Sequence, residues 1–172
     1  MDLHNELRTK YMKTGADTIA AWIGDDEDRF AQLMDIYVHG TKAEIQRSAW
    51  AMDMVAQKFP GLAAKHIDTI VQRMEQPKLH DAVRRHGARI LMMIDMPERI
   101  HASVMNLCFD LLADPKQAIA VRCLAMDVLA KLAITYPELK PELIALMENE
   151  EQPSAGFISR RNLVMAKLKK IS

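Results

Sequence analysis

Positions 38 residues apart in this chain carry the same kinds of residue, and this periodicity constrains the fold more than any other feature. Ile45, Val83 and Val121 form an apolar column with that spacing. Three more columns share it: small residues (Ala49, Gly87 and Ala125), prolines (Pro77, Pro115 and Pro153) and arginines (Arg84, Arg122 and Arg160). Because a fixed period of roughly 20 to 50 residues is typical of stacked repeat units, we predict a repeat architecture.

Each predicted repeat contains two helices, as the unit over residues 98–137 illustrates. Apolar residues recur in its first half at the spacing of one helical face, at Ile100, Val104, Leu107 and Leu111. Pro115 ends that helix, because proline cannot extend a helix that precedes it. A second apolar face runs over residues 121–132, and Pro137 closes the unit.

These repeats predict an all-α fold, a right-handed α-solenoid (an alpha-alpha superhelix) of about four helix pairs, with roughly nine helices in total. We expect a single domain over residues 1–172, in which N-terminal capping helices precede four helix-pair repeats: 1–24, then 25–60, 61–97, 98–137 and 138–172. No linker rich in Pro, Gly or Ser divides the chain, and no segment alternates convincingly with period 2. The pattern therefore favours neither a second domain nor a sheet.

The repeats resemble those of HEAT-type (ARM/HEAT) proteins, whose units are helix pairs with Val-Arg at the start of the second helix. The segment LLADPKQAIAVRCLAMDVLAKLA (111–133) carries that pattern. Four shorter segments are similar to a group of small uncharacterised bacterial HEAT-like proteins: IQRSAWAMD (45–53), HDAVRRH (80–86), DLLADP (110–115) and YPELKPEL (136–143). The resemblance spans nearly the full chain, and it implies the solenoid fold strongly and a biochemical activity hardly at all.

Charge and composition narrow the classes of partner. Hydrophobic residues make up 49% of the chain and charged residues 27%, and the formal net charge is +0. This neutral total removes the simplest argument for binding nucleic acid or an anionic membrane. No apolar run approaches the roughly 20 residues of a membrane span, so we expect no membrane partner. Cys108 and Cys123 fall inside apolar helix patterns, which predicts free thiols and a cytoplasmic location.

The candidate site is a binding surface without catalytic residues. The six histidines form no H-x-x-x-H pair and the two cysteines no C-x-x-C, so we predict no metal and no cofactor. Second helices usually line the concave face of a solenoid, where partners bind. The candidate residues on these helices are Arg47, Trp50, Arg84, Arg85, Arg89 and Arg122. Two alternatives stay open: the arginine column bonds loop carbonyls or acids of neighbouring units, and Trp50 packs between units.

The function predicted from these features is a non-enzymatic protein-interaction or scaffold module that holds a protein or peptide on its concave face. The alternative is a nucleic-acid binder that resembles the HEAT-like alkylpurine DNA glycosylases, with Trp50, Asp53, Arg85 and Arg89 at the damaged base. The neutral charge and the 5% aromatic content disfavour this alternative. We expect an unknown protein or peptide as partner, and a monomer or a weak homodimer.

Overall fold

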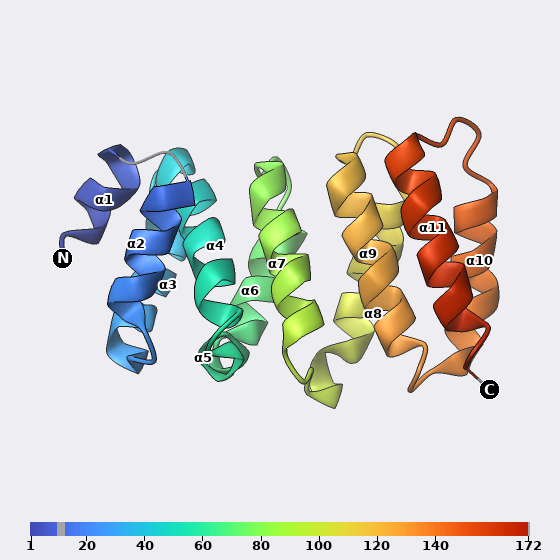
Figure 1. The fold of residues 1–172 in the computed structure, drawn as a ribbon, viewed down its shortest axis with the longest axis horizontal. Helices are drawn as coiled ribbons and strands as arrows, with labels where there is room; N and C mark the ends of the chain where they lie inside the picture. Colours follow the sequence, from blue (N-terminus) through green and yellow to red (C-terminus); the bar gives the residue numbers. More distant parts are fainter. Residues whose placement is uncertain (10–12, 172) are drawn as a thin grey trace. The chain divides into compact units, whose positions relative to one another are not determined.

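The computed structural model describes residues 1–9 and 13–171, and within these ranges every regular element is a helix (Figure 1). The predicted all-α class is therefore confirmed, whereas the handedness and the 38-residue period stay predictions. Contacts group the chain into two compact units, Met1–Met96 and Pro97–Ser172. No helix in the described part of the chain has both the length and the apolar character needed to span a bilayer.

The first unit contains seven α-helices within its described residues: α1 (Leu3–Thr9), α2 (Lys13–Ile23), α3 (Glu27–His39), α4 (Lys42–Ala56), α5 (Pro60–Lys65), α6 (Ile67–Glu75) and α7 (Asp81–Met93). Helices α2, α4 and α7 lie side by side in one layer, with α3 and α6 in a second layer behind them (Figure 1). The α4–α7 contact therefore joins two consecutive second helices.

The second unit follows the same plan over its described residues, with α8 (His101–Ala113), α9 (Ile119–Leu132), α10 (Lys140–Glu148) and α11 (Ala155–Leu168). Short 3-10 helices, η1 (Glu98–Ile100) and η2 (Pro137–Leu139), precede α8 and α10. Helices α9 and α11 pack together in one layer, and α8 and α10 lie behind them (Figure 1).

The described residues form eleven α-helices rather than the roughly nine that we predict. One difference lies at Pro60-Gly61, where the sequence indicates the end of a helix and the structure begins the short helix α5. Proline is compatible with the first position of a helix, because the N–H it lacks has no intrahelical partner there. Helix α5 buries Leu62 and Ala63 and then gives way to α6 at His66.

A buried glutamate fixes the start of α4 and ties α1 to it. Thr41 and Glu44 form a reciprocal capping box at the amino end of α4. The Glu44 carboxylate, which is 1% exposed, also bonds His4 Nδ1 at 2.8 Å and Arg8 Nε at 2.9 Å. These bonds, with that from His4 first and those from Thr41 next, lower the pKa of Glu44 from 4.5 to about 2.

Small residues allow the helices of the first unit to approach closely at Ala49 and Gly87, two members of the small-residue column. Ala49 is 2% exposed, and Gly87 lies directly against the buried side chain of Met74. A Cβ on Gly87 would lie 2.3 Å from Sδ and 2.8 Å from Cγ of Met74. A side chain at position 87 would therefore force the buried Met74 side chain to move.

We expect Gly87→Ala to destabilise the protein by about 1–3 kcal/mol, because the crowding outweighs the gain in helix propensity. The matched control is Gly61→Ala in α5, where a Cβ has no neighbour within 4 Å. Its expected effect is between zero and a gain of about 1 kcal/mol. Urea denaturation followed by circular dichroism measures both, and equal effects of the two substitutions would contradict the proposed α6–α7 contact.

The capping box also predicts a dependence of stability on pH. Because folding lowers the pKa of Glu44, this residue stabilises the fold fully above pH 4.5, and its contribution is lost as the pH falls toward about 2. The difference in unfolding free energy between wild type and Glu44→Gln should therefore shrink through this window. Denaturant titrations at several pH values measure it, and a difference independent of pH would exclude Glu44 as the titrating group.

Candidate protein-binding surface on α4 and α7

Two members of the arginine column, Arg84 and Arg122, cap helices, one in each unit. Arg84 donates from Nε to the Met74 carbonyl at 3.2 Å and from Nη2 to the Gln76 carbonyl at 2.8 Å, at the end of α6. Arg122 donates from Nε to the Leu112 carbonyl at 2.9 Å, near the end of α8. Because the last carbonyls of a helix have no intrahelical partner, each arginine satisfies groups that the helix itself leaves open. The structure thus contains the loop-carbonyl bonds of the first alternative.

Arg122 is enclosed by its own unit and is therefore not available to a partner. The residue is 3% exposed, and its guanidinium lies 4.9 Å above the ring of Phe157. Its Nη2 donates to the Glu150 carboxylate, and this hydrogen bond holds the pKa of Glu150 below its ordinary value. We leave Arg122 out of the candidate surface, because its charge is already paired inside the fold.

The last member of the predicted column departs from this pattern. Arg160 Nη1 lies 2.8 Å from Oδ2 of Asp127 on α9, whereas the neighbouring Arg161 donates to the Met147 carbonyl at 3.5 Å, near the end of α10. Burial raises the pKa of Asp127, and the charge of Arg160 opposes that shift. The 38-residue spacing therefore aligns Arg160 with Arg84 and Arg122. The arginine that bonds a carbonyl near the end of α10, however, is Arg161.

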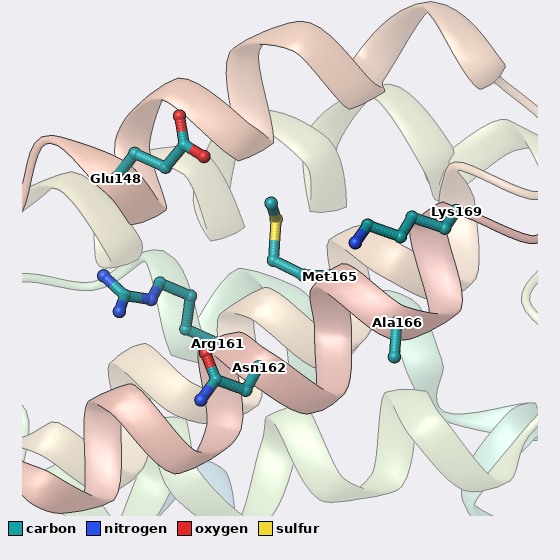
Figure 2. A pocket seen from close by; sticks show the side chains of 6 residues that line it. All are labelled: Glu148, Arg161, Asn162, Met165, Ala166 and Lys169. Atoms are coloured by element: carbon teal, nitrogen blue, oxygen red, sulfur yellow. The ribbon is translucent and has the colours of Figure 1, made fainter.

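Arg161 also lines a cavity of about 550 Å³ between α10 and α11 (Figure 2). The side chain of Met165 extends between the two helices, with Arg161 on one side and Lys169 on the other, and Glu148 lies across from them (Figure 2). The cavity is therefore lined by one acidic and two basic side chains, together with apolar side chains. The sequence reasoning did not identify this cavity.

Arg47 is directed toward the end of α1. Its Nη1 donates to the carbonyl oxygens of Leu7 and Arg8, the latter at 2.8 Å. A guanidinium held in this way has a structural role first, as at Arg84. The candidate residues that point away from helix ends are therefore Trp50, Arg85 and Arg89.

A buried carboxylate organises these three residues. Asp53 on α4 is fully buried, and its Oδ2 lies 2.7 Å from Nδ1 of His86 and 3.3 Å from Nε of Arg89, both on α7. Its Oδ1 accepts from Gln57 Nε2 at 3.3 Å. An ionised carboxylate only accepts hydrogen bonds, so His86 donates from Nδ1 and presents Nε2 to Arg85 Nη2 at 3.4 Å.

Trp50 completes this surface by stacking on His86. The two ring centroids are 5.9 Å apart and the planes are inclined by 15°. Trp50 is half-buried. Its exposure is therefore intermediate between the two predicted alternatives, a side chain packed between units and one that faces solvent. Arg85 is exposed, and the side chain of Arg89 retains 46% of its accessible surface. We call Trp50, Arg85 and Arg89 the α4–α7 surface.

Sequence reasoning missed His86 as the residue that supports this surface. A signal was present, because Asp53 and His86 are 33 residues apart, as are Asp127 and Arg160, the acid–base pair between α9 and α11. In each unit a second helix thus supplies the acid and the next second helix supplies the base.

Several groups that could carry chemistry are buried. Asp53 has no exposed surface, so it does not reach a ligand in the manner that the glycosylase alternative requires. Burial raises the pKa of the Cys108 thiol to about 12, and both cysteines are free and buried. Over residues 1–9 and 13–171, no group of three or more His, Cys, Asp or Glu side chains is placed to hold a metal ion.

Comparison with known protein families identifies a match. A family model described as a HEAT repeat domain matches residues 3–168, a range that includes parts of both compact units. No curated protein and no solved structure matches the chain.

We expect Asp53→Asn to cost about 1.5–3 kcal/mol of stability, because it replaces a charged acceptor that three side chains share. Arg89→Gln should cost at most about 1 kcal/mol, since the arginine is half-exposed and the contact is longer. Thermal and urea denaturation of both variants measure this order. A larger loss for Arg89→Gln would show that Arg89, and not His86, is the main partner of Asp53.

Proposed function

Because the chain belongs to the HEAT repeat family, we propose that it is a protein-interaction module that binds a protein or peptide on the α4–α7 surface. The observation that carries this proposal is the Asp53–His86 pair, which holds Trp50 and Arg89 in place from beneath. Rigidly supported side chains lose little conformational entropy on binding, and this is what distinguishes a binding surface from scattered exposed residues.

The residue types on this surface favour a protein partner. Tryptophan and arginine dominate the energetically important positions of protein interfaces. The guanidinium groups of Arg85 and Arg89 match carboxylates in bidentate geometry, and the indole of Trp50 offers an apolar face beside them. The partner segment that fits this combination carries acidic side chains next to a large apolar residue.

The nucleic-acid alternative receives less support. Its strongest feature, a tryptophan among arginines, is shared with protein interfaces. The chain is neutral overall, and Asp53 is enclosed by His86, Gln57 and Arg89. We therefore propose the protein-binding function and treat nucleic-acid binding as an outcome of the test.

Affinity capture from lysate of the source cells tests the proposal when wild type is compared with Arg85→Ala and Trp50→Ala. We expect each variant to retain at least tenfold less of the specific partner, a change that corresponds to about 1.4 kcal/mol. Arg85 is exposed, so its substitution should leave stability within about 0.5 kcal/mol.

The matched control is Lys116→Ala, which removes an exposed cation from the second unit. It should retain the partner at the wild-type level. Unchanged capture by Arg85→Ala and Trp50→Ala would reject the α4–α7 surface. A gel shift of random duplex DNA with steep salt dependence would instead support the nucleic-acid alternative.

A further inference from the structure

A cavity of about 610 Å³ lies within the first unit, beside the amino-terminal ends of α4 and α7 and the loop before α7. Three permanent cations line it, one each from α4, α6 and the loop: Lys42, Arg73 and Lys78. Apolar side chains form much of the remaining wall: Ile45, Leu79 and Val83. The volume lies in the range typical of small-molecule sites.

No carboxylate is among the residues that line this cavity. Glu44, on the first turn of α4, is buried and bonded to His4, Arg8 and Thr41. His80 also lines the cavity, and its Nδ1 accepts from the Ala82 N–H as the cap of α7. The three cations thus create a local positive excess in a chain whose formal net charge is +0.

The Nε of Arg73 lacks an internal acceptor. It is buried and has no hydrogen-bond partner among the described residues. A buried N–H without an acceptor is costly, and arginines in folded proteins normally find a carbonyl or a carboxylate. Arg84, ten residues along from the carbonyl of Met74, illustrates the usual arrangement.

Lys78 is held in a conformation that disfavours a side chain. Its φ is 60°, in the left-handed region that glycine occupies more easily, and Pro77 precedes it in the turn. Residues with strained backbone conformations cluster at ligand sites, where the function of the side chain offsets the conformational free energy of the backbone. At position 78, glycine would suit the backbone better and would remove the cation.

From these observations we propose that the cavity binds a phosphate monoester. Three permanent cations match a group that carries a charge of about −1.5 to −2 better than they match a single carboxylate. Ile45, Leu79 and Val83 accommodate an apolar body attached to the phosphate. This inference does not rest on the proposed function, because the α4–α7 surface uses other residues.

Titration of the full chain with phenyl phosphate, monitored by ³¹P NMR and by calorimetry, tests the site. We expect saturable binding that is at least tenfold tighter than that of inorganic phosphate, which lacks the ring, and of phenylacetate, which lacks the second charge. Equal or tighter binding of phenylacetate would overturn the assignment to phosphate. The absence of saturable binding at millimolar phenyl phosphate would overturn the site.

Lys78→Gly separates ligand binding from folding. It relieves the backbone and removes one cation, so we expect equal or greater stability and at least tenfold weaker binding of phenyl phosphate. Lys42→Gln should weaken binding similarly, and Lys116→Gln in the second unit serves as the matched control. Wild-type affinity in both cavity variants would overturn the proposal, even if Arg73→Gln fails to fold.

The same titration distinguishes the source of the ester. A peptide with one central phosphoserine that binds more tightly than free O-phosphoserine would support the site as a reader of phosphorylated side chains. Equal affinities would support it as a site for a free phosphate ester. Failure of the lysate capture experiment would leave these results unchanged, because the two sites use different residues.

Discussion

The hydrogen bond between Asp53 and His86 is the interaction on which the α4–α7 surface depends. It joins the second helix of one pair to the second helix of the next, and it lies at a fully buried carboxylate. A buried charge is tolerated only when its lone pairs are satisfied, so the geometry around Asp53 is tightly defined. This geometry also fixes the positions of Trp50 and Arg89. Trp50 stacks on His86, and Arg89 contacts the carboxylate oxygen that His86 contacts.

The second unit also contains an acid–base contact between two second helices, formed by different residues. Asp127 on α9 pairs with Arg160 on α11 across the same sequence separation as Asp53 and His86. Arginine caps at helix ends then fix each first helix to its partner, as Arg122 does at Leu112. Apolar burial supplies the cohesion of each unit, whereas these polar contacts determine the register of neighbouring helices.

Periodicity predicted the all-α class and the helix pairs, because these features follow from spacing alone. Periodicity did not predict the burial of Arg122. An arginine that caps a helix and an arginine that faces solvent can occupy the same position of the 38-residue repeat, so spacing does not distinguish them. The short helix α5 was missed because Pro60 is compatible with a helix start as well as an end. The role of His86 depends on which helices meet, and a contact between neighbouring pairs is not visible in the pattern of one helix.

The tautomer of His86 shows whether Asp53 accepts a hydrogen bond from Nδ1 and so links α4 to α7. Long-range ¹H–¹⁵N correlation of the imidazole rings in the folded protein distinguishes a proton on Nδ1 from one on Nε2. We expect His86 to carry its proton on Nδ1, where Asp53 accepts it, and we expect this proton to exchange slowly with solvent. A proton on Nε2 alone, or rapid exchange at Nδ1, would contradict the proposed link between α4 and α7.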